Sequence, residues 1–314
     1  MLRHSLAAAL GCALAAALVF GGCAQAVPSA AVTPPSAAPP AAAGTPAPLR
    51  QPASGAVSSQ PVYEYETQEL YARRGENQIY GILYVPQGAG EQMPAVIYSH
   101  GYGGDHSYGE QYAQALAARG YVAYCFDFCG GSPGSLSDGS TLEMSLFTEQ
   151  TDLEAVMAMV TDLPFVDAGN LFLLDTSQGG AVSAITAAAH PDQVRGMALL
   201  YPAFSLVEDA NRRYQSAGEI PDSQYFLWMT VGRAYFEPLL GYDIYDAIAA
   251  YDRDVLILHG DADSIVPLSS SERAVKAYPS AELVTLPGAG HGFSGGDASA
   301  AIDAITDYFN AHIQ

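Results

Sequence analysis

The sequence is short of basic residues. Its 314 residues include 12 lysines and arginines against 33 aspartates and glutamates, which gives a formal net charge of −21. Nucleic-acid-binding proteins need a basic patch that neutralises phosphates, and segments that bind anionic lipids by charge need clustered lysine and arginine. We therefore expect no nucleic-acid partner and no electrostatic attachment to a membrane. A polyanionic substrate would also be repelled at long range.

Cysteine is scarce as well. Of four cysteines, Cys12 and Cys23 lie near the N-terminus, which leaves Cys125 and Cys129 for the rest of the chain. Unless the chain turns sharply between them, an extended path from Cys125 to Cys129 exceeds the span of a disulfide, so we expect two free thiols. No histidine or cysteine pair has metal-ligand spacing. The sequence implies no metal and no cofactor.

Residues 1–23 are typical of a signal peptide. An early basic residue, Arg3, precedes an apolar stretch that is short for a membrane-spanning helix. The run Val-Phe-Gly-Gly-Cys, ending at Cys23, resembles a bacterial lipobox. We expect export and a cell-surface lipoprotein whose only membrane contact is a lipid on Cys23. Ordinary cleavage near Ala24 or Ala26, which would release a secreted protein, is the alternative.

Residues 24–60 lack apolar periodicity, whereas residues 61–314 have the pattern of a folded domain. The first segment is rich in proline, alanine and serine and predicts a disordered tether. The second alternates apolar runs with helical segments, which predicts an α/β fold with a doubly wound, mostly parallel sheet. Two early segments, 63–71 and 79–84, alternate polar and apolar residues and favour an antiparallel edge. Buried strands are expected at 95–99, 122–127, 171–174, 197–201, 255–259 and 283–286, and helices at 108–119, 146–160, 180–190, 268–278 and 298–310.

One serine stands at a junction between an expected strand and an expected helix. The sequence at 171–180 reads Leu-Phe-Leu-Leu-Asp-Thr-Ser-Gln-Gly-Gly, with Ser177 where the apolar run ends. A sharp strand-to-helix turn at a serine is typical of a nucleophile elbow, with the pattern G-x-S-x-G. Asp175 stands where that pattern has its first glycine.

Two further residues follow their own expected strands in the order Ser, Asp, His. Asp263 lies in the polar turn after residues 255–259, and His291 lies between two glycines after residues 283–286. Loops at the carboxyl ends of parallel strands meet at one rim of a sheet. We therefore predict a catalytic triad of Ser177, His291 and Asp263, in which the histidine acts as base and the aspartate orients it. Asp261 is the rival acid.

An activated serine also needs N–H donors for the oxyanion that forms during attack. The main-chain N–H of Gln178, directly after the serine, is one candidate. The other is the N–H of Tyr102, in the turn His-Gly-Tyr-Gly-Gly that follows residues 95–99. Backbone donors suit the task because they are fixed before charge develops on the carbonyl oxygen.

Residues 203–251 interrupt the alternation of strands and helices. The segment lies between two expected core strands and is rich in aromatic residues. We expect a small cap of helices and loops over the catalytic rim. Its aromatic side chains either line an acyl or aryl pocket or pack the cap onto the core.

These motifs together resemble the α/β-hydrolase fold, and within it the cinnamoyl and feruloyl esterase group, over about residues 62–312. Two departures from the usual pattern are Asp175 and the run Cys-Gly-Gly at 129–131, where Arg-Gly-His is more usual. The matching stretches are 99–104 (Ser-His-Gly-Tyr-Gly-Gly), 117–121 (Ala-Ala-Arg-Gly-Tyr), 126–132, 177–180 (Ser-Gln-Gly-Gly), 259–267 and 288–293 (Gly-Ala-Gly-His-Gly-Phe).

The resemblance implies a serine carboxylic-ester hydrolase that forms an acyl-enzyme on small acyl or aryl esters, including hydroxycinnamoyl esters. A peptidase of the prolyl-oligopeptidase type shares the fold and triad order, although such enzymes carry a large additional domain. A non-catalytic, surface-tethered binding protein on a hydrolase scaffold is the alternative from another class, with Asp175 as its support.

Overall fold

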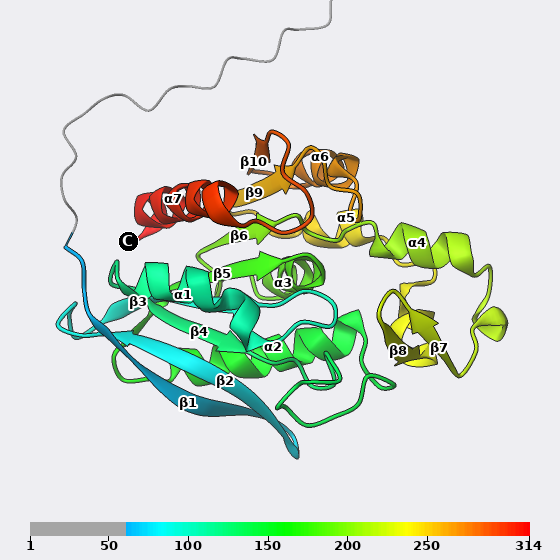
Figure 1. Ribbon diagram of the computed structural model, residues 1–314, viewed down its shortest axis with the longest axis horizontal. Helices are drawn as coiled ribbons and strands as arrows, with labels where there is room; N and C mark the ends of the chain where they lie inside the picture. The colour runs from blue at the N-terminus through cyan, green and yellow to red at the C-terminus, as the bar shows by residue number, and fades with distance from the viewer. Residues whose placement is uncertain (1–60) are drawn as a thin grey trace, which may run out of the picture. The chain divides into compact units, whose positions relative to one another are not determined.

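The computed structural model describes residues 61–314, which form an eight-stranded sheet between two layers of helices (Figure 1). The predicted signal peptide, the lipobox at Cys23 and the predicted tether all lie outside the described residues. The strand order is β1-β2-β4-β3-β5-β6-β9-β10. These strands are β1 (Tyr65–Arg74), β2 (Asn77–Pro86), β3 (Met93–Ser99), β4 (Val122–Phe126), β5 (Val166–Thr176), β6 (Gly196–Leu200), β9 (Val255–Gly260) and β10 (Ala281–Leu286).

The sheet confirms the predicted doubly wound fold. Strands β4, β3, β5, β6, β9 and β10 run parallel, and β1 and β2 form an antiparallel edge. Every residue of β4, β6 and β9 is buried, as strands covered on both faces should be. Strand β5 starts five residues before the expected apolar run, because Val166 pairs with Met93 ahead of a register shift.

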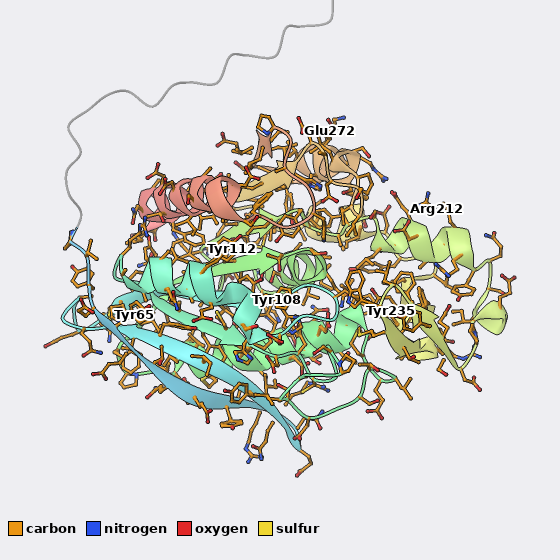
Figure 2. All side chains as sticks on the ribbon, in the orientation of Figure 1. Tyr65, Tyr108, Tyr112, Arg212, Tyr235 and Glu272 are labelled. Atoms are coloured by element: carbon orange, nitrogen blue, oxygen red, sulfur yellow. The ribbon has the colours of Figure 1, made fainter. Side chains whose placement is uncertain are left out.

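Two apolar cores lie on opposite faces of the sheet. Along β3, Ala95 and Ile97 join one core, whereas Val96 and Tyr98 join the other. This alternation is the period-two pattern of a strand. Side chains fill the space around Tyr112, which belongs to the second of these cores (Figure 2). The first core lies beneath α2 (Leu146–Thr161), α3 (Gln178–Ala189) and α6 (Leu268–Ala277), and the second beneath α1 (Glu110–Ala117) and α7 (Gly295–His312).

The segment between β6 and β9 differs from the expected cap of helices and loops, because it contains a two-stranded antiparallel hairpin. Helices α4 (Leu206–Arg213) and α5 (Ile244–Ile248) flank the hairpin strands β7 (Ser223–Phe226) and β8 (Met229–Gly232). Figure 1 shows the hairpin beside α4, beyond the carboxyl ends of the central strands. We call the segment 203–251 the cap.

The thiols of Cys125 and Cys129 are buried and free, as expected. Burial raises the pKa of both, that of Cys129 to about 12, so the reactive thiolate is scarce at neutral pH. We predict that iodoacetamide leaves both cysteines unmodified in the folded protein at pH 8 and alkylates both in guanidinium chloride. Peptide mass spectrometry measures each site separately. Alkylation of either cysteine in the native protein would contradict the packing described here.

Two findings hold for residues 61–314. None of their helices is long and apolar enough to cross a membrane. Within the same range, no three histidine, cysteine, aspartate or glutamate side chains form a group that could hold a metal ion.

Candidate active site

Ser177 occupies a strained turn between β5 and α3. Its φ and ψ angles are 52° and −118°, in a region that residues with a side chain rarely adopt. Main-chain hydrogen bonds hold this conformation: Ser177 N–H donates to Leu200 O at 2.9 Å, and Ser177 O accepts from Ala203 N–H at 2.8 Å. Strain of this kind persists only where the surroundings impose it, and it is common at functional sites.

Glycine allows close backbone approaches at two positions around this turn. A Cβ at Gly179 would lie 2.3 Å from Ser99 O, and a Cβ at Gly101 would lie 3.0 Å from Ser177 Cβ. The first glycine lets α3 approach the end of β3. The second lets the loop after β3 reach the serine.

Asp175 is compatible with the turn because its side chain points away from the turn, into the protein interior. The residue pairs with Ser99 and Leu199 on the neighbouring strands. Its fully buried carboxyl lies beside the hydroxyls of Ser99 and Ser183, and forms no hydrogen bond with any described residue. Burial raises the pKa of this carboxyl well above its usual range, which favours the neutral acid.

Ser177, His291 and Asp263 meet at the carboxyl ends of β5, β10 and β9. His291 Nε2 lies 3.0 Å from Ser177 Oγ, and His291 Nδ1 lies 2.8 Å from Asp263 Oδ2. A carboxylate can only accept, so Nδ1 carries the proton and Nε2 is free to accept from the serine hydroxyl. The three side chains therefore form one chain of hydrogen bonds with the geometry of a serine triad.

The Asp263 carboxylate is fixed by contacts with main-chain N–H groups and with His259. Its Oδ1 accepts from the N–H groups of Ile265 at 2.8 Å and Val266 at 2.9 Å, and its side chain is fully buried. His259 Nε2 lies 3.3 Å from Oδ2 and 3.1 Å from Val266 O, while Ser271 Oγ lies 2.7 Å from His259 Nδ1. Burial lowers the pKa of His259, so this histidine is a neutral support.

Asp261, the alternative candidate for the triad acid, forms its hydrogen bond with a main-chain N–H and not with His291. Its Oδ1 accepts from Gly288 N–H at 2.6 Å, at the start of the loop that carries His291. Asp261 therefore anchors that loop, and the carboxylate that bonds to the histidine belongs to Asp263.

The two candidate oxyanion donors lie on either side of the serine. Gln178 begins α3, so its N–H is one of the unpaired donors at a helix N-terminus. Tyr102 follows Gly101, whose backbone packs against Ser177. Within residues 61–314, neither N–H donates a hydrogen bond to another protein group. Both remain available to a bound carbonyl oxygen.

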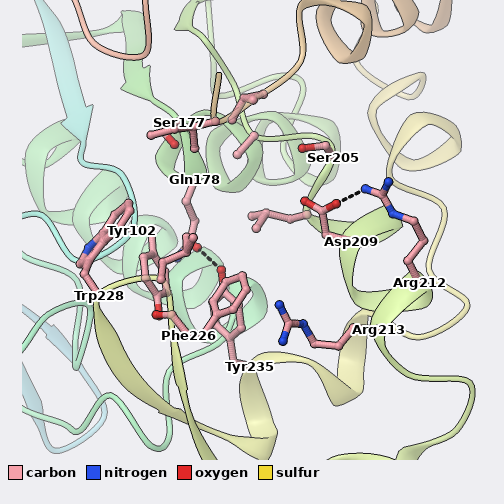
Figure 3. A pocket seen from close by; sticks show the side chains of 15 residues that line it. Tyr102, Ser177, Gln178, Ser205, Asp209, Arg212, Arg213, Phe226, Trp228 and Tyr235 are labelled. Atoms are coloured by element: carbon pink, nitrogen blue, oxygen red, sulfur yellow. Dashed lines mark hydrogen bonds and ion pairs between the residues drawn. The ribbon is translucent and has the colours of Figure 1, made fainter. Parts of the chain in front are cut away.

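Two cavities open on Ser177 and share Tyr102 and Trp228 as walls. The larger, about 480 Å³, is lined by the cap and by Gln178 (Figure 3). The smaller, about 250 Å³, is lined by His291 and Tyr201. Four aromatic side chains form part of the wall of the larger cavity: Tyr102, Phe226, Trp228 and Tyr235. The guanidinium of Arg213 lies over the Phe226 ring, 5.1 Å from its centre.

Known proteins share this architecture. A family model described as "Serine aminopeptidase, S33" matches residues 90–233, and a second described as "TAP-like protein" matches residues 241–312. An uncharacterized protein from each of two Mycobacterium tuberculosis strains is 28% identical over 214 residues, which is 67% of this chain and 67% of the relative.

Solved structures of esterases resemble the fold. Est1E from Butyrivibrio proteoclasticus with bound ferulic acid has a TM-score of 0.70 and 25% identity, covering 77% of this chain and 98% of that one. Acetyl xylan esterase 1 from a Thermoanaerobacterium species has a TM-score of 0.60 and 20% identity, covering 82% of this chain and 86% of that one. The chain therefore has the α/β-hydrolase fold.

Proposed function

We propose that the protein is a serine carboxylic-ester hydrolase that works through an acyl-enzyme on small acyl or aryl esters. The hydrogen-bond chain from Asp263 through His291 to Ser177 is the observation that supports this most strongly. The esterases among the structurally similar proteins agree with this proposal. The Est1E complex favours hydroxycinnamoyl esters as one substrate class.

The reaction follows from the positions of the three side chains. His291 takes the hydroxyl proton as Ser177 Oγ attacks the ester carbonyl carbon, and Asp263 stabilises the resulting imidazolium. The N–H groups of Tyr102 and Gln178 hold the oxyanion. The bond to the alcohol oxygen breaks, and His291 returns the proton to that oxygen. Water then repeats the sequence on the acyl-enzyme and releases the acid.

The two cavities divide the substrate between them. His291 lines only the smaller cavity and must reach the leaving oxygen, so the alcohol belongs on that side. The acyl group then enters the larger cavity beneath the cap. Its aromatic wall suits an aryl acyl group, and Arg213 offers a cationic contact to a polar substituent at the far end.

The larger cavity also bears on the peptidase alternative, which the description of one matching family model favours. An aminopeptidase needs an unpaired acidic side chain to bind the substrate's free amino group. Asp209 is the acidic residue of this cavity, and it is paired with Arg212 (Figure 3). Ester hydrolysis therefore fits the cavity better. Release of a free amine from an aminoacyl amide, without ester turnover, would favour the peptidase.

A series of p-nitrophenyl esters from acetate to decanoate, together with methyl ferulate, tests the proposed function. We expect turnover that depends on Ser177 and a chain-length or aryl preference set by the larger cavity. Absence of Ser177-dependent turnover on every ester would contradict the proposal. Export and lipidation at Cys23 are separate proposals from the N-terminal sequence, tested by the mass of the mature N-terminal peptide.

Trp228 offers a test of the cavity assignment. Its ring forms a wall of both cavities and packs 5.4 Å from the Tyr102 ring, centre to centre. We predict that Trp228→Ala lowers kcat/KM for methyl ferulate by about 10-fold, because an aromatic contact contributes roughly 0.5–1.5 kcal/mol. The kcat/KM for methyl acetate, whose acyl and alcohol groups are both small, should change little.

Tyr225 provides the matched control, since it lies on the same hairpin, is 70% exposed and lines neither cavity. Tyr225→Ala should leave kcat/KM for both esters unchanged. An equal loss on both esters in Trp228→Ala would contradict the assignment of the larger cavity to the acyl group.

A further inference from the structure

Gln178 is held by its side chain as well as by its place in the chain. The residue is 2% exposed, and its Nε2 donates to Glu149 Oε2 at 2.7 Å. Its Oε1 accepts from the Tyr235 hydroxyl, also at 2.7 Å (Figure 3). Both ends of the amide are therefore fixed, one by α2 of the core and the other by the cap.

Glu149 is an unusual residue to bury. It lies in the first turn of α2 and is 1% exposed. Among residues 61–314 it has no lysine, arginine or histidine within ion-pair distance. Burying such a group is unfavourable unless it forms a specific hydrogen bond. The bond that Glu149 forms is to the side chain next to the nucleophile.

Tyr102, the other candidate oxyanion residue, is also fastened to the cap. Its hydroxyl donates to Phe226 O at 2.9 Å, in strand β7. Its ring packs edge-on against Tyr235, with centroids 5.4 Å apart. The side chains of both oxyanion residues thus end on cap residues that touch each other, since the Phe226 and Tyr235 rings are 5.7 Å apart.

We propose that the hydrogen-bond chain Glu149–Gln178–Tyr235, together with the bond from Tyr102 to Phe226, makes the seating of the cap a determinant of the oxyanion hole. Glu149 and Tyr235 are positioning residues: they touch no reacting atom and act through the main chain of Gln178. The inference rests on the proposed function. If the cap shifts, the side chains of both donor residues move with it. Stabilisation of the transition state therefore depends on the position of the cap, just as substrate binding does.

The proposal has a distinctive pH dependence. Burial raises the pKa of Glu149 to about 8, with the nearby Asp152 carboxylate adding to the shift and Gln178 opposing it. Asp152 is itself paired with Arg74 from β1, and Tyr102 and Tyr235 lie close enough to Glu149 to interact with it electrostatically. Below pH 8 the carboxyl is neutral. Above it, a buried negative charge forms behind the residue that must stabilise an oxyanion, so the turnover rate should fall.

The test compares kcat, KM and melting temperature for Tyr235→Phe and Tyr214→Phe in the full chain with a p-nitrophenyl ester. Tyr214 is the matched control, since its hydroxyl donates within the cap to Gln224 Oε1 at 2.6 Å and has no bond to Gln178. We expect Tyr235→Phe to lower kcat by about 10-fold with little change in KM, because a displaced donor costs less than the ~10²–10³ of a deleted one. Tyr214→Phe should keep the wild-type kcat.

Glu149 supplies the second arm. Glu149→Gln preserves an acceptor for Gln178 Nε2, so it should keep most of kcat near pH 7 and lose the decline above pH 8. Glu149→Leu should lose kcat at both pH values. The inference is overturned if Tyr235→Phe behaves like Tyr214→Phe, or if Glu149→Leu lowers only the melting temperature. Absence of Ser177-dependent turnover in the wild-type protein would instead overturn the proposed function and this inference together.

Discussion

Replacing Ser177 by alanine is expected to lower kcat for ester hydrolysis by about 10⁶-fold, the loss seen when a member of a triad that acts as a unit is removed. The Ser177 hydroxyl, which lies 3.0 Å from His291 Nε2, is the nucleophile of the proposed mechanism. Without it the remaining donors can bind an ester but cannot form an acyl-enzyme. Initial rates with p-nitrophenyl acetate measure the effect.

Ser183→Ala is the matched control for that substitution. Ser183 lies on the same helix, α3, and its buried hydroxyl has no hydrogen-bond partner among the described residues. Its removal should leave kcat close to the wild-type value. Retention of most activity by Ser177→Ala, or an equal loss in Ser183→Ala, would contradict the assignment of the nucleophile.

Asp263→Asn is expected to lower kcat by about 10⁴-fold. An asparagine at this position can place its NH₂ group toward His291 Nδ1, which favours the tautomer with the proton on Nε2. The histidine then cannot accept the serine proton. The same change also weakens the interaction with the imidazolium that forms during attack, because an amide carries no charge.

Asp261→Asn separates the catalytic contribution of an acid from its contribution to the loop. Asp261 bonds to Gly288 N–H and supports the loop that carries His291. We expect a much smaller loss of kcat, on the order of 10-fold at most, because the histidine keeps its carboxylate partner. The melting temperature should change little, because the asparagine oxygen still accepts from Gly288 N–H. Steady-state kinetics of Asp263→Asn and Asp261→Asn, measured side by side, show which of the two acids belongs to the triad. A larger loss in Asp261→Asn would reverse the assignment.

The core strands and the serine elbow could be predicted because their signals are local. Apolar runs that end in polar or glycine-rich turns mark buried strands and their carboxyl ends, where Ser177, Asp263 and His291 stand. The order of these three residues along the chain then predicted that they act together as a triad. Burial of Asp175 could not be predicted, since a carboxylate in a strand normally faces solvent.

The hairpin of the cap was missed for a physical reason. Its turn contains Leu227 and Trp228, and Leu227 has a positive φ of 52°. Tight hairpin turns are normally marked by glycine or asparagine, which adopt that conformation readily. Here packing of the hairpin aromatic residues against Tyr102 and Tyr235 holds the turn, and no local pattern shows such contacts.

Three supporting residues were also missed. Glu149 has an ordinary position for an acid, in the first turn of a helix, and the sequence gives no sign of its burial or of its bond to Gln178. Tyr235 reads as one of many cap aromatic residues, and His259 as part of a strand. Each role arises from contacts between segments far apart in the sequence, such as the 2.7 Å bond from Tyr235 to Gln178.

Labelling with a fluorophosphonate probe tests the central claim most directly, because the probe reacts with a serine only when a base and an oxyanion hole activate it. The site of attachment is identified by peptide mass spectrometry of the full chain. We predict one label per molecule, on Ser177, and none in His291→Ala. Absence of labelling in the folded wild-type protein, or attachment to another residue, would contradict the account.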